Sequence, residues 1–159
     1  MKDAEFERIV ERHAQDVYAF LAYRTGDHHL AEDLLADTLE RAYRARGRFD
    51  RRRASEKTWL ISIALNRWRD VIRRETSERT ALARLGRDEP HSDGTERRDE
   101  RRALMEALGT LATPERDVVT LVYGAGLTAK QVASVLDEPV TTVQGRLYRG
   151  LARLKDELG

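Results

Sequence analysis

The sequence contains no cysteine, only three prolines and few aromatic residues (6% Phe, Trp and Tyr). Without cysteine the chain can form no disulfide, thiolate zinc site or Cys nucleophile, and a reducing cytoplasm is the expected location. No apolar run approaches the ~20 residues of a membrane helix, and the start of the sequence has no apolar signal core, so we expect no membrane insertion. No glycine-rich phosphate loop and no nucleophile–base pair is present, so we expect no enzymatic activity, no cofactor and no metal.

Charged residues are abundant instead, at 36%, and their distribution is uneven although the formal net charge is only +1. Residues 1–40 carry four Lys/Arg against ten Asp/Glu, whereas residues 41–74 carry twelve against three. The charged side chains of residues 140–155 are all positive. Two such basic zones attract polyanions even when total charge is near zero. Arg-rich solvated helices would give the same composition, so charge alone leaves nucleic-acid binding open.

Hydrophobic periodicity predicts an all-α protein with two small helical domains, residues 1–75 and 101–159. The intervening residues 76–100 are rich in charge and contain Gly and Pro. They cannot bury enough apolar surface to offset the entropy of ordering, so we expect a flexible linker. Fully extended, this linker could span ~80 Å.

In the N-terminal domain three helices are expected. The first ends at Gly26, the second runs from about His28 to Gly47, and the third begins near Ser55, a plausible N-cap. The expected buried side of the third helix consists of Trp59, Leu60, Ile63, Ala64, Trp68, Val71 and Ile72.

The C-terminal domain shows the pattern of a helix-turn-helix. Thr113 is expected to cap a helix that has Pro at its first position. Thr128 and Gln131 form a capping box, and a longer basic helix follows from about Thr141. The apolar side of that last helix is expected to be Val143, Leu147, Leu151 and Leu154. An ordinary helical hairpin would give the same pattern, but the glycines of the last helix point to close approach of its backbone to a neighbour.

Three further patterns suggest interaction surfaces. The third helix carries a polar stripe of Ser62, Asn66, Asp70 and Arg73, in which Asn and Arg could read base edges. The 47–54 loop places an aromatic side chain among arginines, a combination that suits unstacked bases. The second helix is acidic and could dock a basic protein. Each pattern is also compatible with a solvated helix face or, for Phe49, with a hydrophobic plug.

Two stretches together resemble the extracytoplasmic-function group of bacterial RNA polymerase sigma factors. They are AEDLLADTLERAYRARGRFD, continuing to TWLISIALNRWRDVIRR, and LTAKQVASVLDEPVTTVQGRLYRGLARLKDEL. The resemblance covers nearly the whole chain, including order and spacing. It implies a region 2 that binds the polymerase clamp and opens the −10 element, and a region 4 that binds the polymerase flap and reads the −35 element. Promoter DNA, duplex and single-stranded, and an anti-sigma protein are the other partners it implies.

Site residues follow from the resemblance position by position. Asp33 and Asp37 fall where the second helix meets the clamp. The −10 and strand-opening positions are Arg48, Phe49, Trp59, Asn66, Asp70, Arg73 and Arg74. The −35 positions are Thr142, Gln144, Gly145, Arg146, Tyr148 and Arg149. Members of the group usually have Lys or Arg followed by Ser where this chain has Gln144 and Gly145.

The sequence therefore predicts an alternative sigma factor that directs promoter-specific transcription initiation. Two other functions stay open from the residues alone. One is a sigma-like decoy that binds an anti-sigma protein but not DNA, and the other is a helix-turn-helix regulator that works without polymerase. The basic 47–54 loop and the acidic second helix favour the sigma factor. A helical enzyme is the least favoured alternative.

Overall fold

A computed structural model describes residues 1–78 and 95–159, and every regular element within these ranges is helical, which confirms the all-α prediction. The chain divides into two compact units, Met1–Asp88 and Glu89–Gly159. Most of the expected linker lies outside the described residues. Its two ends, residues 76–78 and 95–100, are helical, because they continue helices in a sequence rich in Glu and Arg, which are good helix formers.

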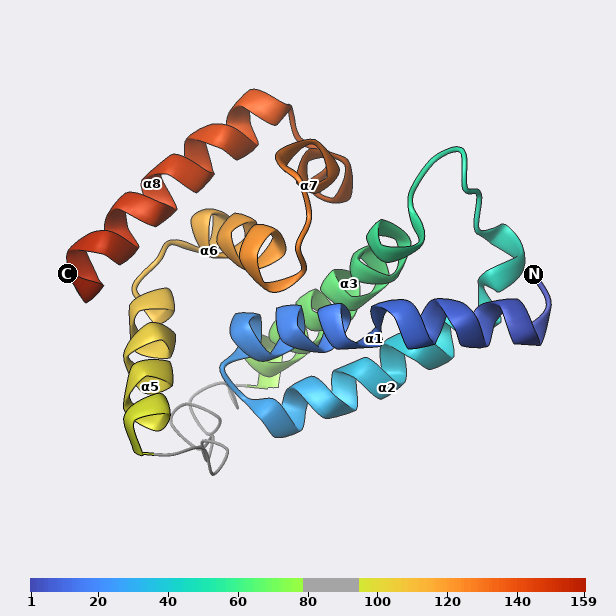
Figure 1. The fold of residues 1–159 in the computed structure, drawn as a ribbon, viewed down its shortest axis with the longest axis horizontal. Coiled ribbons are helices and arrows are strands. Elements are labelled where there is room, and N and C mark those ends of the chain that lie inside the picture. Colours follow the sequence, from blue (N-terminus) through green and yellow to red (C-terminus); the bar gives the residue numbers. More distant parts are fainter. Residues whose placement is uncertain (79–94) are drawn as a thin grey trace. The chain divides into compact units, whose positions relative to one another are not determined.

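Three long helices lying side by side make up the N-terminal unit (Figure 1). They are α1 (Asp3–Thr25), α2 (His28–Arg44) and α3 (Glu56–Glu78), with a short 3₁₀ turn, η1 (Arg46–Arg48), after α2. As predicted, α1 ends at Gly26, which has a left-handed φ of 71°. The start of α3 is also as predicted, because Ser55 Oγ accepts a hydrogen bond from the Thr58 N–H at 3.1 Å. By contrast, α2 ends before Gly47, which lies inside η1.

The buried side of α3 differs from the prediction. Leu60, Ile61, Ala64 and Leu65 are almost completely buried, with no more than 1% of each exposed. The other expected core residues, Trp59, Ile63, Trp68 and Val71, are half-buried, and Ile72 is exposed. Helix α3 is apolar on two adjoining sides, and its packing against both α1 and α2 selects the side that carries Ile61 and Leu65.

The C-terminal unit contains the helices α5 (Thr95–Gly109), α6 (Thr113–Val119), α7 (Ala129–Leu136) and α8 (Val140–Leu158). A π-helical turn, η2 (Thr120–Gly124), continues α6. The predicted capping box is confirmed: the Gln131 N–H donates to Thr128 Oγ1 at 3.1 Å, and the Thr128 N–H donates to Gln131 Oε1 at 2.9 Å. The cap expected at Thr113 is wrong by one residue, because Thr113 is already helical and Ala112 is the N-cap.

Gly150 explains why a glycine is tolerated in the middle of α8. It is buried, and a Cβ at this position would lie 2.7 Å from Cγ2 of Val119 and 3.4 Å from Cβ of Glu115. The absence of a side chain therefore lets the α8 backbone pack directly on α6. This is the close approach that the sequence indicated, and the neighbour at Gly150 is protein.

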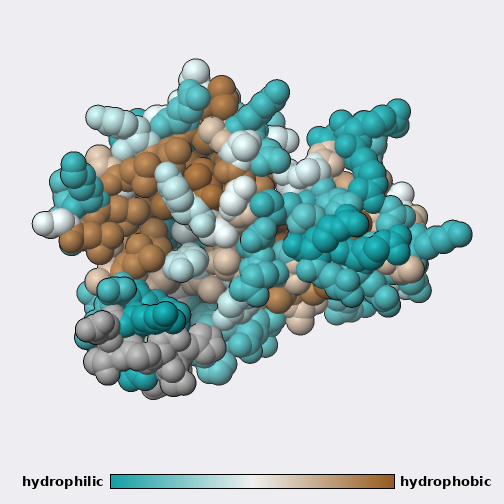
Figure 2. Space-filling view, in the orientation of Figure 1, coloured by the Kyte–Doolittle hydropathy of each residue, from teal (hydrophilic) through white to brown (hydrophobic). Residues whose placement is uncertain are grey.

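The apolar side of α8 is narrower than predicted. Val143 and Leu154 are buried and Leu147 is half-buried, but Leu151 is 37% exposed. Its place against α6 is taken by Gly150, one residue earlier. In the view of Figure 2, apolar surface gathers over the C-terminal unit, around α6 and α8. This unit thus presents apolar side chains to solvent as well as arginines.

Candidate nucleic-acid and polymerase interfaces

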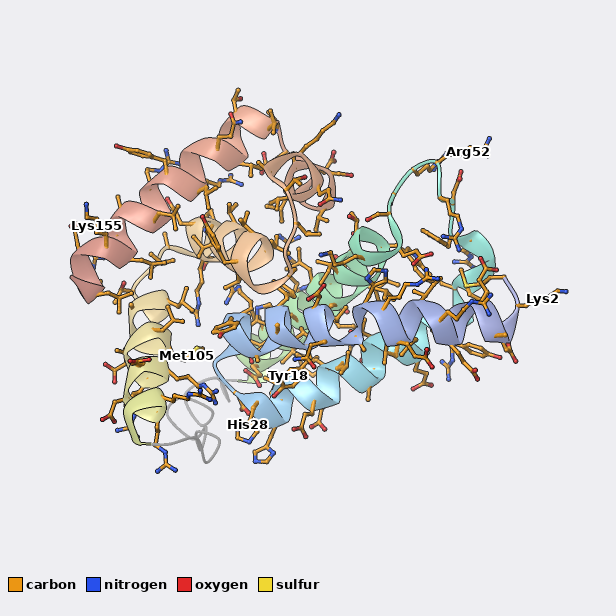
Figure 3. The ribbon with its side chains drawn as sticks, viewed as in Figure 1. Lys2, Tyr18, His28, Arg52, Met105 and Lys155 are labelled. Atoms are coloured by element: carbon orange, nitrogen blue, oxygen red, sulfur yellow. The ribbon has the colours of Figure 1, made fainter. Side chains whose placement is uncertain are left out.

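The segment between η1 and α3 is a tight turn organised by Asp50. Its backbone carbonyl accepts hydrogen bonds from the N–H groups of Arg53 (3.0 Å) and Ala54 (3.3 Å). Its carboxylate accepts another from the Arg52 N–H at 2.9 Å, and this contact lowers the pKa of Asp50. Two arginines of the turn extend into solvent: Figure 3 labels Arg52 at the tip of the loop, where its side chain is 91% exposed, and Arg53 is 88% exposed. The loop therefore offers cations to a ligand in solvent.

Phe49 in this loop is brought together with Trp59 in the first turn of α3, and both are predicted strand-opening residues. Their rings are stacked, with centroids 4.6 Å apart and planes 24° apart. Both residues are half-buried, so Phe49 is neither a core plug nor a fully exposed ring. The Arg51 guanidinium lies 5.4 Å from the Phe49 centroid. An aromatic pair with basic neighbours is suited to stacking against an unpaired base.

Arg51 itself is held by carboxylates. Its guanidinium donates to Glu5 Oε1 on α1 at 2.5 Å and to Glu56 Oε2 at the start of α3. Glu56 also accepts from Arg12 Nη1 at 3.0 Å and lies 3.1 Å from His13 Nε2. The contact with Arg51, followed by those of His13 and Arg12, holds the pKa of Glu56 below its usual range. Arg51 is thus part of the scaffold of the loop.

On α3, the predicted polar stripe has separate roles. Asn66 is exposed, as a residue that reads a base must be. Asp70 instead accepts from Arg73 Nη2 at 2.7 Å and from Arg67 Nη1 at 3.1 Å, so its carboxylate orients two arginines. Ser62 is turned to its own helix and donates to the Thr58 carbonyl at 2.9 Å. Arg73 and Arg74 are both exposed beyond Asp70, which gives the far end of this stripe its positive charge.

The two acidic residues predicted to meet the polymerase clamp differ in their surroundings. Asp33 is exposed on α2. Asp37 is paired with Arg67 of α3, whose side chain is only 14% exposed, and lies 3.6 Å from Arg41 Nε. Asp37 therefore links α2 to α3, and Asp33 is the one of the two with its side chain toward solvent.

On α8, some of the residues predicted to face DNA contact other residues of the C-terminal unit, and others are exposed. Gln144 and Tyr148 are exposed, Tyr148 to 77%. Arg149 is 61% exposed but donates from Nε to Glu115 Oε1 of α6 at 3.3 Å. Arg146 Nη2 lies 3.4 Å from Glu138 Oε1. Thr142, Gly145 and Arg146 are half-buried. The outer surface of α8 is therefore formed chiefly by Gln144, Tyr148 and Arg149.

The residues that hold the loop were not found from the sequence. Glu5 and Glu56 are 46 and 5 residues from Arg51, and no periodic pattern connects the three. The only sequence signal was the coexistence of an acidic N-terminal stretch with an Arg-rich loop. The exposed Arg52 and Arg53 were within the predicted basic loop but were not singled out.

Residues 1–78 and 95–159 contain neither a candidate metal site nor a candidate membrane span. In these ranges no three His, Asp or Glu side chains are grouped as metal ligands would be. None of the helices in the described part combines the length and the apolar character needed to cross a bilayer.

Comparison with known proteins agrees with this arrangement in both halves of the chain. Residues 9–78 match the family model of sigma-70 region 2, and residues 101–154 match that of sigma-70 region 4. The RNA polymerase sigma factor CarQ of Myxococcus xanthus is 31% identical over 156 residues, which cover 97% of this chain and 89% of CarQ. The ECF RNA polymerase sigma factor SigK of Mycobacterium sp. (strain KMS) is 29% identical over 160 residues, covering 97% of this chain and 83% of SigK.

A solved structure has the same fold. It is that of CnrH in complex with the cytosolic domain of CnrY; CnrH is 28% identical, with a TM-score of 0.76, and the match covers 99% of this chain and 89% of CnrH.

A helical region 2 and a helix-turn-helix region 4 in one chain define a sigma factor of the sigma-70 type. The chain belongs to this family, within its extracytoplasmic-function (ECF) group. It is an alternative sigma factor: it binds core RNA polymerase and promoter DNA and directs transcription initiation. Sigma factors as a family are not enzymes.

Proposed function

We propose that the N-terminal domain, residues 1–75, captures the opened −10 strand with the loop between η1 and α3 and with the exposed residues of the α3 stripe, Asn66 and Arg73. The observation that carries this proposal is the stacked Phe49–Trp59 pair next to a loop whose Arg52 side chain is 91% exposed. An unpaired base can stack on an aromatic ring while a neighbouring guanidinium neutralises its phosphate. Duplex DNA, whose bases are stacked and paired, offers no such face. The surface therefore favours opened DNA over the duplex and lowers the cost of melting.

In the same proposal α3 supplies the base-reading and phosphate contacts next to the loop. The amide of Asn66 can donate to and accept from a base edge. Arg48, Arg73 and Arg74 contact phosphates. Asp70 contributes by orienting Arg73, to which it is hydrogen-bonded at 2.7 Å, and makes no direct contact with a base.

The C-terminal domain, residues 101–159, reads the duplex at the −35 element with the outer surface of α8. Arg149 can pair with guanine, and Gln144 with adenine, in the major groove. Tyr148 is exposed enough to reach a phosphate or a thymine methyl. Thr142, Gly145 and Arg146 lie at the edge of this surface, where Arg146 supports the turn before α8 through Glu138.

Polymerase contacts are proposed on surfaces that DNA does not use. Asp33 on α2 faces the basic clamp, and Asp37 supports this surface from behind by tying α2 to α3. The exposed apolar side chains of the C-terminal unit, Leu151 among them, suit the flap. Residues 76–100 join the two domains as a linker.

We further propose that an anti-sigma protein inhibits this chain and that the chain acts in the cytoplasm. CnrH, 28% identical to this chain, was solved with the cytosolic domain of another protein, CnrY. An anti-sigma protein that occupies the polymerase- or DNA-facing helices would hold this chain inactive. Transcription takes place where the polymerase and the chromosome are, which is the bacterial cytoplasm. The chain itself performs no bond-making step, because RNA synthesis belongs to the polymerase.

The test of strand capture compares Asn66→Ala and Phe49→Ala with the unchanged protein, each assembled with core polymerase. Unpaired thymines are footprinted with permanganate on a promoter that the unchanged protein opens. Both variants should bind core polymerase normally and form fewer open complexes. On a promoter with a pre-opened bubble, a defect that persists indicates lost base capture, and one that shrinks indicates impaired melting. Open complexes at the unchanged level on duplex DNA would refute the assignment of this surface.

A further inference from the structure

The arginines of the loop fall into two groups that the sequence does not distinguish. Arg52 and Arg53 are about nine-tenths exposed, and their ion-pair partner is Asp50 of the loop itself, at 3.2 and 3.9 Å. Arg46 and Arg51 are instead paired with the first turn of α1, Arg46 with Asp3 (3.6 Å) and Arg51 with Glu5 (2.5 Å). The first pair secures η1 and the second secures the loop. Two acidic residues in the first turn of α1, Asp3 and Glu5, therefore hold the segment proposed to face DNA at Arg46 and at Arg51.

Arg51 differs from Arg46 in that it bridges carboxylates from two different helices. One guanidinium nitrogen, Nη2, reaches Glu5 on α1, and the other, Nη1, reaches Glu56 at the start of α3. Glu56 is only 12% exposed and is itself fixed by Arg12 and His13. A residue in the middle of an exposed loop is thus tied to two helices through one planar group, whose fork of donors suits this geometry.

This arrangement bears directly on Phe49. The Arg51 guanidinium lies 5.4 Å from the centroid of the Phe49 ring, two residues earlier, and Phe49 stacks on Trp59, three residues after Glu56. The ion pairs and the ring stack therefore restrain the same short stretch of backbone. Arg51 is already neutralised by two carboxylates, so it has little positive charge to offer a phosphate.

We propose that Glu5 and Glu56 are positioning residues for strand capture: through Arg51 they hold residues 49–55, with Phe49 against Trp59, in the conformation that receives the displaced strand. This inference rests on the proposed role of the loop in binding opened DNA. Its physical basis is preorganisation, because a loop that is already ordered loses less conformational entropy when it binds. The carboxylates repel DNA phosphates, so their contribution to DNA binding must come through Arg51.

The proposal is tested with Glu56→Gln and Glu5→Gln in the full-length chain. Each change removes a charge and keeps the size of the side chain. Glu11→Gln is the matched control, because Glu11 is an exposed carboxylate on the same helix as Glu5. The partners Arg12 and Arg51 are more than half exposed, so water can solvate them once the carboxylate is gone and the fold is expected to survive.

The first readout needs no promoter. Trypsin cleaves after arginine, so the rate of cleavage after Arg52 and Arg53, followed by mass spectrometry, reports how well the loop is held. We expect Glu56→Gln to raise this rate roughly 3- to 10-fold, because, of its three contacts, only the one with the half-exposed Arg51 holds the loop, and a single charge-assisted contact supports an effect of this size. Glu11→Gln should leave it unchanged. The double variant Glu5→Gln, Arg51→Gln should be cleaved as fast as Arg51→Gln alone, because Glu5 acts through Arg51.

The second readout is open-complex formation on a promoter that the unchanged protein opens. Glu56→Gln should lower it by a similar factor on duplex DNA and on a pre-opened bubble, with unaltered affinity for core polymerase. Cleavage and opening at the unchanged level would overturn the proposal. So would a loss of core binding in parallel with opening, because that marks a general structural role. If the unchanged protein opens no promoter, it is the proposed function that is refuted. The rate of tryptic cleavage then still tests whether Glu5 and Glu56 hold the loop.

Discussion

Replacing Gly150 by alanine tests how closely α8 packs on α6. The added Cβ would lie 2.7 Å from Cγ2 of Val119, well inside van der Waals contact, and Val119 is a buried β-branched residue that cannot rotate away at low cost. Overpacking of this kind costs about 1–3 kcal/mol. The same change removes a glycine from a helix interior, which stabilises the helix by about 1 kcal/mol.

Gly145→Ala is the matched control, because it makes the same substitution in the same helix. The nearest atoms to a Cβ there all belong to the guanidinium of Arg149, the closest being Nη1 at 3.3 Å, and this is the end of a long and largely exposed side chain. Both variants gain the same helix propensity, so the difference between them isolates the packing cost at Gly150. In a unit of this size, about 1–3 kcal/mol corresponds to a difference in melting temperature of roughly 4–24 °C.

The assay can assign the effect to one unit. Both tryptophans of the chain, Trp59 and Trp68, lie on α3 in the N-terminal unit. Tryptophan fluorescence therefore follows that unit alone, whereas circular dichroism at 222 nm follows the helices of both. Gly150→Ala should lower the circular-dichroism transition of the C-terminal unit relative to Gly145→Ala and leave the fluorescence melt unchanged. Equal circular-dichroism melts for the two variants would refute the close packing of α8 on α6.

Three other predictions address the charged contacts. Asp33→Arg should weaken binding to core polymerase in an anisotropy titration without changing the fluorescence melt. Asp37→Arg should weaken binding and also destabilise the N-terminal unit by about 1–3 kcal/mol, because it places a cation against a poorly exposed arginine. Equal fluorescence melts for the two variants would contradict the pairing of α2 with α3. Arg149→Ala should weaken binding to upstream promoter duplex by about 1–3 kcal/mol and relax preference at one base pair, and unaltered binding across an upstream library would remove Arg149 from the reading surface. The pKa of Glu56 is lowered in the folded state, so its contribution to stability is fully present above the ordinary glutamate pKa, roughly 4.3, and is lost as the pH falls through the lower folded-state value. The melting temperature measured by fluorescence should therefore depend less on pH below roughly 4.3 in Glu56→Gln than in the unchanged protein. Identical pH profiles would count against the contact between Glu56 and Arg51.

The helix ends could be predicted from the sequence where the signal is local. Gly26, Ser55 and the Thr128–Gln131 box each act within four residues of the backbone groups that they satisfy. Such signals do not depend on the rest of the fold. Two expected ends were wrong: α2 ends at Arg44, before Gly47, and the N-cap expected at Thr113 is one residue earlier, at Ala112.

The buried faces and the ion pairs could not be predicted in the same way, because they depend on neighbours distant in sequence. Helix α3 is apolar on two sides, and only packing against α1 and α2 selects Ile61 and Leu65 over Ile63 and Ile72. Leu151 was expected inside, but Gly150 brings the helices so close that the contact is made by backbone. For the candidate site, the sequence predicted which segments carry it, namely the 47–54 loop and one surface each of α2, α3 and α8.

The role of each side chain within those surfaces depends on the ion pairs that it forms. Asp37 was expected at the polymerase and is bound to Arg67, 30 residues away. Arg51 was one of several equivalent loop arginines in the sequence, and its two carboxylate partners set it apart. Spacing along one helix shows which side chains share a face, but it does not show which of them are already occupied by a neighbouring helix.

The central claim is that this chain directs core RNA polymerase to particular promoters, and run-off transcription on a library of promoter sequences tests it most directly. Core polymerase with the unchanged protein should transcribe from a discrete set of templates that share upstream and −10 elements, and core polymerase alone should not. Asn66→Ala should reduce transcription from that set without abolishing binding to core. Transcription from no template, or equally from all templates, would contradict the account.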